Sequence, residues 1–193
     1  MHENIEFLQA FLKNPLKVGA IAPSSPELSR KMLEDVNPRV ESIVLELGPG
    51  TGSFTKLIGD LLPEKGCYLG VELDRNLVKC LRLKFPDIRI VRGNAYKAFA
   101  IHQRSELGKV DYILSGLPFA SMPGPVSIKI YEEIARFMDL GGCMFRTFQY
   151  AHGYYLPSAI KLREFMKKRY GAAEKSPLVI KNVPPAYTLT WRS

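Results

Sequence analysis

Short apolar runs alternate with longer amphipathic segments along most of the chain. The apolar runs predict buried strands over residues 43–47, 67–73, 88–91, 110–115 and 142–150. The amphipathic segments predict helices that end at residue 62 and that cover residues 74–84, 125–138 and 158–170. Because regular alternation of strands and helices is typical of βαβ units, we expect an α/β fold with a doubly wound, mostly parallel sheet.

Two more strands are expected near the end of the sequence, over residues 178–180 and 187–191. Only a short turn, residues 182–185, separates them, so we expect these two strands to pair in the antiparallel direction. The predicted sheet then has seven strands.

The residues before this pattern predict a helical extension. One face of a first amphipathic helix carries Ile5, Leu8, Phe11 and Leu12. A second helix is expected over residues 26–35, with Ser24 and Glu27 at the spacing of a capping box. We therefore divide the chain into an extension, residues 1–36, that serves as a membrane or substrate cap, and a domain, residues 37–193. The first helix can lie in a bilayer interface or pack on the sheet, and both alternatives remain open.

Composition and charge limit the partners and the compartment that we expect for the protein. The 193 residues include 27 Lys and Arg against 19 Asp and Glu, a net charge of +8, which predicts an anionic partner such as nucleic acid, a lipid surface or an acidic substrate. No apolar stretch is long enough for a transmembrane helix, and the first residues lack the features of a secretory signal. The three cysteines are widely spaced, so neither a disulfide framework nor a metal site is expected, and the cytoplasm is the expected compartment.

A glycine-rich turn follows the first predicted strand. The segment over residues 46–55 reads ELGPGTGSFT, and its glycines let a backbone approach a ligand closely. It matches neither the GxGxxG motif of dinucleotide binding nor the GK[ST] ending of a phosphate loop. Glu72 ends the second strand, where a carboxylate can accept hydrogen bonds from both ribose hydroxyls. Asn94, in a Gly-Asn-Ala segment, follows the third strand, where its amide can contact an adenine edge.

Together these three features resemble those of the S-adenosylmethionine-dependent methyltransferases with a Rossmann-like fold. The resemblance implies S-adenosylmethionine as the cofactor, with Glu46 orienting its methionine end. The residues expected to bind the cofactor are Glu46, Gly48, Gly50, Thr51, Gly52, Glu72, Leu73, Asn94, Ala95 and Ser115. The alternatives are a tight turn without a ligand for the glycines and a capping role for Asn94, where the family usually has Asp.

The segment over residues 115–119, SGLPF, lies after the fourth strand, at the sheet edge where open α/β folds bind ligands. Methyltransferases that act on exocyclic amines of bases resemble it, with N-L-P-[YF] at this place: the amide accepts from the amino group and the ring stacks on the base. Gly116 replaces that Asn, which disfavours adenine as the acceptor. An aliphatic amine instead needs loss of a proton and in-line placement, and a dry site with aromatic rings favours its neutral form.

Residues 18–25, 115–119 and 182–191 resemble three stretches of the bacterial phospholipid N-methyltransferases, which methylate phosphatidylethanolamine. Ornithine-lipid N-methyltransferases are close relatives, and the motifs do not separate the two. The resemblance implies methyl transfer to the amine headgroup of a membrane lipid. The expected substrate residues are Ser24, Arg30, Gly116, Leu117, Pro118 and Phe119. The candidate catalytic residues are Tyr150, Tyr187 and His152.

The expected partners are therefore an anionic membrane surface and a lipid, with the protein peripheral on the inner face of the cytoplasmic membrane. An RNA adenine dimethylase is the rival enzyme class, favoured by the basic charge and by Leu117–Phe119 but disfavoured by Gly116. A non-catalytic cofactor-binding or lipid-binding module is a further alternative, which the intact glycine motif and Glu72 disfavour.

Overall fold

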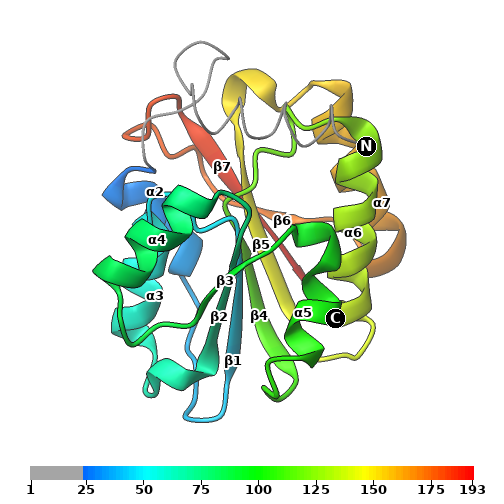
Figure 1. The fold of residues 1–193 in the computed structure, drawn as a ribbon. Coiled ribbons are helices and arrows are strands. Elements are labelled where there is room, and N and C mark those ends of the chain that lie inside the picture. The colour runs from blue at the N-terminus through cyan, green and yellow to red at the C-terminus, as the bar shows by residue number, and fades with distance from the viewer. Residues whose placement is uncertain (1–23) are drawn as a thin grey trace.

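A seven-stranded sheet forms the centre of the computed structural model, which describes residues 24–193 (Figure 1). The strands are β1 (Ile43–Leu47), β2 (Tyr68–Glu72), β3 (Ile90–Arg92), β4 (Val110–Ser115), β5 (Met144–Tyr150), β6 (Glu174–Lys175) and β7 (Ala186–Arg192). Their order across the sheet is β3-β2-β1-β4-β5-β7-β6. Only β7 runs antiparallel to its neighbours, and the other paired strands are parallel. The expected α/β fold with a seven-stranded, mostly parallel sheet is confirmed.

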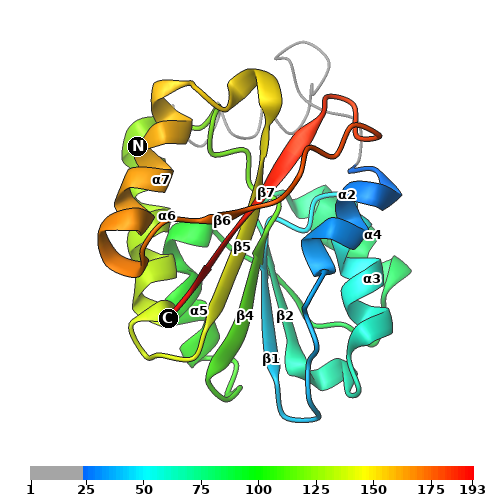
Figure 2. The same cartoon turned by 180° about the vertical axis from the view of Figure 1, so that it is seen from behind.

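Helices cover both faces of the sheet (Figures 1 and 2). One face is covered by α2 (Pro26–Leu33), α3 (Ser53–Leu61) and α4 (Arg75–Lys84). The opposite face is covered by α5 (Ala98–Gln103), α6 (Gly124–Met138) and α7 (Pro157–Tyr170). Three short 3₁₀ turns complete the pattern: η1 (Lys65–Cys67), η2 (Ala95–Lys97) and η3 (Ala151–Gly153).

The sheet separates two apolar cores. Leu28 of α2 and Ile58 of α3 belong to the core on one face, and Ile134 of α6 and Phe145 of β5 belong to the core on the other. Every residue of β1 and β2 is buried. Strands buried on both faces read as continuous apolar runs, which explains why the sequence showed them clearly. The exception inside β1 is Glu46, a fully buried carboxyl group.

The predicted strand over residues 178–180 is wrong. The sixth strand is instead β6, at Glu174–Lys175, and Val179 forms only an isolated bridge with Ala186. Both residues of β6 are exposed and charged, so no apolar pattern marks them. The expected antiparallel pairing of the last two strands is confirmed for β6 and β7.

Two smaller corrections concern helices. The six-residue α5 was not expected from the pattern, because so short a helix shows little periodicity. The residue that caps α2 is Ser25 and not Ser24: the Ser25 hydroxyl accepts a hydrogen bond from the Leu28 N–H at 3.1 Å. The first predicted helix and the loop up to residue 23 lie outside the described residues.

Two buried polar side chains attach α2 to the rest of the fold. Arg146 of β5 donates hydrogen bonds to the carbonyl groups of Met32, at 3.2 Å, and Glu34 at the end of α2. At the beginning of α2, the Asn182 Oδ1 atom accepts from the Ser25 N–H at 2.9 Å. The described part of the predicted extension is therefore packed on the sheet.

Within residues 24–193, no helix has both the length and the apolar character that crossing a bilayer demands.

Candidate active site

The glycine-rich turn lies at the carboxyl end of β1 and leads into α3. Gly48, Gly50 and Gly52 have φ values of 72°, 60° and 86°, a backbone region that favours glycine. At Gly50 an added Cβ would meet only the Gly48 carbonyl oxygen, 3.9 Å away. Thr51, in the same turn, is exposed. The turn therefore forms an open backbone cradle that a ligand can approach closely.

Glu72, at the end of β2, connects this turn to the next loop. Its two carboxylate oxygens accept hydrogen bonds from the N–H groups of Gly50 and Asp74, both at 2.9 Å. Burial raises the pKa of Glu72, and the backbone hydrogen bonds partly oppose that effect. Because each carboxylate oxygen has more than one acceptor position, the arrangement fits the expected contacts with two ribose hydroxyls.

Glu46 provides a second buried carboxyl group beneath the turn. Its Oε2 atom accepts hydrogen bonds from the hydroxyls of Tyr68, at 2.5 Å, and Thr55, at 2.9 Å. Burial raises the pKa of Glu46 to about 7, although the two hydroxyls act in the opposite direction. The Oε1 atom has no hydrogen-bond partner within the described chain. A buried unpaired acceptor costs on the order of 1–3 kcal/mol, so this atom fits a donor from the amino end of the cofactor or from a water molecule.

Asn94 follows β3, and its side chain takes the capping role that was the alternative for it. The Oδ1 atom accepts from the Tyr96 N–H at 3.2 Å at the beginning of η2. The two amide N–H groups and the second acceptor position of Oδ1 remain for an adenine contact. Ala95 is buried, and the half-buried Leu73 packs against the core.

The loop after β4 packs directly on the glycine turn. The Gly116 N–H donates to the Leu47 carbonyl at 2.9 Å, and a Cβ added at Gly116 would lie 2.7 Å from the Gly48 carbonyl oxygen. Leu117 covers the turn, since a Cβ at Gly48 would lie 2.7 Å from Leu117 Cδ2. The Ser115 hydroxyl, fully buried, accepts from the Leu117 N–H at 3.2 Å. The close approach of Gly116 to the Gly48 carbonyl oxygen requires glycine at position 116.

Phe119, expected to stack on the substrate, lies instead in the core. Its side chain is 1% exposed and its ring contacts Tyr131 edge-on, with the centroids 5.4 Å apart. Pro118 before it is half-buried. The ring turns inward because α6 offers an apolar face directly beneath the loop.

The structure does not bring the two predicted catalytic tyrosines together. In the register of β5 with β7, Tyr187 pairs with Gln149, whereas Tyr150 pairs with Ala186. Paired residues of antiparallel strands share a face, and successive residues along a strand point to opposite faces. Tyr150 and Tyr187 therefore lie on opposite faces of the sheet.

Tyr150 belongs to a row of rings on the α2–α3 face, formed by Phe54, Phe148, Tyr150 and His152 and called here the aromatic row. Successive ring centroids are 6.0, 5.2 and 5.7 Å apart. Phe54 begins the row 3.7 Å from the Cβ position of Gly116, and His152 ends it at the surface. The Tyr150 hydroxyl is buried without a partner in the described chain, and burial raises its pKa above the usual range.

Phe54 and Phe148 were not predicted as site residues. In the sequence they are apolar positions of a helix and a strand, which read as ordinary core residues. The available signal was their aromatic type close to the glycine motif and to the end of the fifth strand.

Tyr187 lies on the opposite face among cations of the protein itself. Its ring contacts that of Tyr154, with centroids 5.3 Å apart. The Arg163 guanidinium lies 3.9 Å above the Tyr154 ring, and the Lys175 ammonium lies 4.6 Å from the Tyr187 centroid. These rings already hold cations, so they are less suited than the aromatic row to receive an amine.

The two substrate residues predicted in the N-terminal region differ in setting. Ser24 is half-buried at the beginning of the described chain. Arg30 is exposed, and its guanidinium donates to the Pro26 carbonyl at 3.2 Å and to Glu27 at 3.4 Å. Within residues 24–193, neither Ser24 nor Arg30 forms a hydrogen bond with the glycine turn. Over the same range, residues 24–193, no group of three or more His, Cys, Asp or Glu side chains is placed to hold a metal ion.

Comparison with known proteins agrees with this geometry. The sequence profile described as ribosomal RNA adenine dimethylase matches residues 2–137. An ornithine lipid N-methyltransferase from Singulisphaera acidiphila is 29% identical over 70% of this chain and 72% of its own length. Ribosomal RNA small subunit methyltransferase A from Chlorobium phaeobacteroides is 26% identical over 68% of this chain, which spans only 48% of that relative.

Solved structures share the fold at low sequence identity. A TehB-like S-adenosylmethionine-dependent methyltransferase from Corynebacterium glutamicum aligns over 100% of both chains, with a TM-score of 0.63 and 15% identity. The profile match covers more than half of the sequence and includes the glycine turn, Glu72 and Gly116. The chain therefore belongs to the ribosomal RNA adenine dimethylase family and is a Rossmann-like S-adenosylmethionine-dependent methyltransferase.

Proposed function

We propose that this methyltransferase acts on the primary or partly methylated amine of a lipid headgroup, in phosphatidylethanolamine or an ornithine lipid. The observation that carries the proposal is the contact between Gly116 and the glycine turn, where a Cβ would lie 2.7 Å from a carbonyl oxygen. An Asn side chain, which would accept a hydrogen bond from an exocyclic base amine, cannot be placed there without moving the backbone. The site therefore favours an acceptor that needs no such polarisation.

An aliphatic amine meets that condition. Its lone pair is already localised, but the amine is protonated near neutral pH and must lose a proton before it reacts. The aromatic row supplies a water-poor setting that favours the neutral form of the amine. The unpartnered Tyr150 hydroxyl can bind the amine, and its raised pKa keeps it a neutral phenol.

In the reaction, the protein binds and orients the amine and excludes water from it. Bound S-adenosylmethionine supplies an electrophilic methyl group, and the amine nitrogen forms a bond to that carbon as the carbon–sulfur bond breaks. Tyr150 holds the nitrogen within the aromatic row, and His152, exposed at the end of that row, passes the released proton to solvent. Much of the rate then comes from alignment of the two reactants.

Two loops at the carboxyl edge of the sheet support contact with a bilayer. Tyr155 and Leu156 lie in the loop before α7, and Ile180 and Val183 in the loop before β7; all four are exposed. Figure 1 shows both loops at the same end of the molecule as the glycine turn. Residues 175–193 contain no Asp or Glu, so the second loop is suited to an anionic surface. This placement agrees with a peripheral site on the inner face of the cytoplasmic membrane, where residues 1–36 would act as a cap.

The relatives support two acceptors, so the test must contain both. The ornithine lipid enzyme is matched over most of its length, whereas the ribosomal enzyme is matched over about half. The purified protein is incubated with methyl-labelled S-adenosylmethionine, total RNA and vesicles of phosphatidylethanolamine, ornithine lipid and phosphatidylglycerol. After solvent extraction the label is counted in each phase, and chromatography of the organic phase identifies the headgroup.

We expect label in the organic phase, and its loss in Glu72→Ala, which removes the carboxylate that holds the glycine turn. Label confined to the RNA would overturn the lipid proposal and make an adenine dimethylase the function of this chain. A Glu132→Ala variant, which changes an exposed carboxylate on α6, is the matched control.

A further inference from the structure

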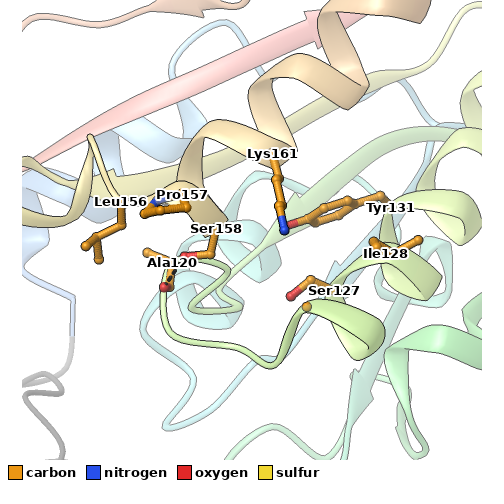
Figure 3. Close-up of a pocket in the computed structure, with 9 residues that line it drawn as sticks. Ala120, Ser127, Ile128, Tyr131, Leu156, Pro157, Ser158 and Lys161 are labelled. Carbon is orange, nitrogen blue, oxygen red and sulfur yellow. Dashed lines mark hydrogen bonds between the residues drawn. The ribbon is translucent and has the colours of Figure 1, made fainter.

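A pocket of about 330 Å³ lies between the first turns of α6 and α7 (Figure 3). Its walls are mainly apolar, with Ala120, Ile128 and Leu156 among the lining residues, and its polar groups come from Ser127, Ser158 and Lys161. Neither the cofactor residues nor the aromatic row line it. The pocket is therefore a separate feature of the carboxyl edge of the sheet.

The beginning of α7 presents backbone donors at this pocket. The first helical hydrogen bond runs from the Ile160 N–H to the Leu156 carbonyl at 3.0 Å, so the N–H groups of Ser158 and Ala159 precede the helical pattern. Among residues 24–193 no side chain caps α6 or α7, and the first turn of neither helix carries an acidic residue. The positive ends of two helix dipoles thus meet at the pocket and favour a negative charge there.

Ser127 is an independent sign of a ligand. Its side chain lines the pocket, it is 2% exposed, and its hydroxyl has no hydrogen-bond partner in the described chain. Buried hydroxyl groups are almost always paired, because leaving one unpaired is unfavourable. Figure 3 shows Ser127 on the α6 side of the pocket and Lys161 extending toward it from α7.

We propose that this pocket binds the oxyanion of the acceptor lipid, a phosphate or a carboxylate, together with the methylene groups next to it. Lys161 supplies the opposite charge, Ser127 and the first N–H groups of α7 supply hydrogen bonds, and Ile128 and Leu156 contact the methylenes. The lipid identity of the ligand rests on the proposed function.

The pocket is well placed for an anion that belongs to the same molecule as the amine. A Cβ at Gly153 of η3 would lie 3.6 Å from Ala120 and from Leu156, so the pocket adjoins the turn that also carries His152. In both candidate lipids a few bonds connect the amine to the acidic group. The pocket therefore selects amines with an acidic group a short distance away.

Equilibrium binding to protein saturated with S-adenosylhomocysteine tests this without relying on methyl transfer. The probes are monomeric dihexanoyl phosphatidylethanolamine, α-N-hexanoyl ornithine and N-hexanoyl-1,4-diaminobutane, which is the ornithine probe without its carboxylate. Isothermal titration calorimetry measures each Kd for wild type, Lys161→Met, Ser127→Ala and Lys168→Met. The last variant removes one charge from α7 at a residue that does not line the pocket.

We expect Lys161→Met to weaken at least one acidic probe about tenfold, as loss of a charged hydrogen bond does, and to leave the diaminobutane probe within about twofold. Ser127→Ala should weaken the same probe without lowering the Tm, since the hydroxyl it removes makes no hydrogen bond with residues 24–193. Dependence on the phosphate probe alone identifies a phospholipid, and dependence on the ornithine probe alone identifies an amino-acid lipid. Equal effects of Lys161→Met and Lys168→Met, or equal affinity for the acidic and diaminobutane probes, would overturn the proposal.

The two proposals fail in different ways. If neither lipid is methylated but the acidic probes still bind in a Lys161-dependent manner, the proposed function is wrong and the oxyanion site stands. If lipid is methylated and Lys161→Met leaves the affinities unchanged, the oxyanion site is wrong and the function stands.

Discussion

Gly116 is the residue where the cofactor side and the acceptor side of the site touch. Its missing side chain lets the loop after β4 lie against the glycine turn, with a hydrogen bond from its N–H to the Leu47 carbonyl. A residue with a Cβ would push the two loops apart. At this position a close backbone contact takes the place of the Asn side chain of the N-L-P-[YF] motif.

Gly116→Asn should therefore lower kcat/KM for methyl transfer about 100-fold, because a displacement of about 1 Å between reactants has an effect of that size. It should also weaken the binding of S-adenosylhomocysteine. Kinetics with labelled cofactor and calorimetry measure the two effects. Gly66→Asn is the control, since an added Cβ there meets no atom within 4 Å. RNA methylation gained by Gly116→Asn would contradict the structural reading and restore adenine as the acceptor.

Glu46 should make the stability of the fold depend on pH. Its pKa in the folded protein is about 7, above the value of 4.5 for the free side chain, so the folded state binds the proton more tightly. The contribution of Glu46 to stability is then largest below pH 4.5, falls as the pH rises from 4.5 to about 7, and is lost at higher pH; the change in this contribution is on the order of 3 kcal/mol.

Glu46→Gln should remove this part of the pH dependence, because an amide does not titrate. Urea denaturation at pH 5 and pH 8 gives the comparison, and the variant should gain stability relative to wild type at the higher pH. The exposed Glu132→Gln provides the control. A constant difference between wild type and Glu46→Gln at both pH values would show that this carboxyl group does not titrate in the interval.

Among the elements, α2 depends most on a single side chain from elsewhere. Arg146 lies in the middle of β5, is buried, and donates to carbonyl groups at the end of α2 and to Thr190 of β7 at 2.7 Å. The guanidinium therefore joins a helix end to two strands and satisfies carbonyls that the helix itself leaves unpaired.

Arg146→Met should lower the free energy of unfolding by about 3 kcal/mol, since it leaves buried carbonyl acceptors without donors. Arg146→Lys should recover only part of the loss because an ammonium lacks the forked geometry. Denaturation with urea measures both. Arg192→Met is the matched control: Arg192 is exposed, pairs with Glu174, and should contribute less than about 1 kcal/mol. Similar losses for Arg146→Met and Arg192→Met would refute this role.

The sequence predicts elements well where burial is continuous and poorly where tertiary pairing decides. β1 was predicted with its observed bounds, because a short run buried on both faces is typical of a strand inside a parallel sheet. β6 was missed because two exposed charged residues become a strand only through their pairing with β7. Arg146 reads as an interruption of a strand, and its bonds to α2 connect residues more than 110 positions apart.

In the site, too, the sequence predicts local motifs well and predicts poorly the contacts that depend on tertiary pairing. Local motifs predicted which residues gather at the glycine turn, since the chain itself brings Glu46, the glycines and Glu72 to the ends of neighbouring strands; their contact with the cofactor stays a prediction. The substrate side depends on strand register, which places Tyr150 and Tyr187 on opposite faces. Phe119 looked available next to a proline, yet the apolar face of α6 buries it.

On the scale of the whole molecule, charge and exposed apolar side chains should act together on a membrane. The net charge of +8 predicts binding to phosphatidylglycerol vesicles that weakens with salt. The exposed apolar side chains of the loops before α7 and β7 should add a contribution to vesicle binding that salt does not weaken. Ile180 and Val183, 73% and 76% exposed, are the clearest contributors.

The double variant Ile180→Ser, Val183→Ser should weaken vesicle binding at high salt about tenfold, by loss of apolar insertion. Vesicle sedimentation of the full chain measures it. Leu83→Ser is the control, because Leu83 is 85% exposed but belongs to α4 and to neither of the two loops. Equal effects of the loop variants and Leu83→Ser would show that the bilayer does not select these two loops.

The contact of Gly116 and Leu117 with the glycine turn makes the two binding sites energetically linked. If the proposed lipid amine shifts the acceptor loop on binding, the shift would reach the glycine turn through this contact. By thermodynamic reciprocity, the factor by which an amine changes the affinity for S-adenosylhomocysteine equals the factor by which S-adenosylhomocysteine changes the affinity for that amine. One backbone contact thus couples the affinities of the two sites in both directions.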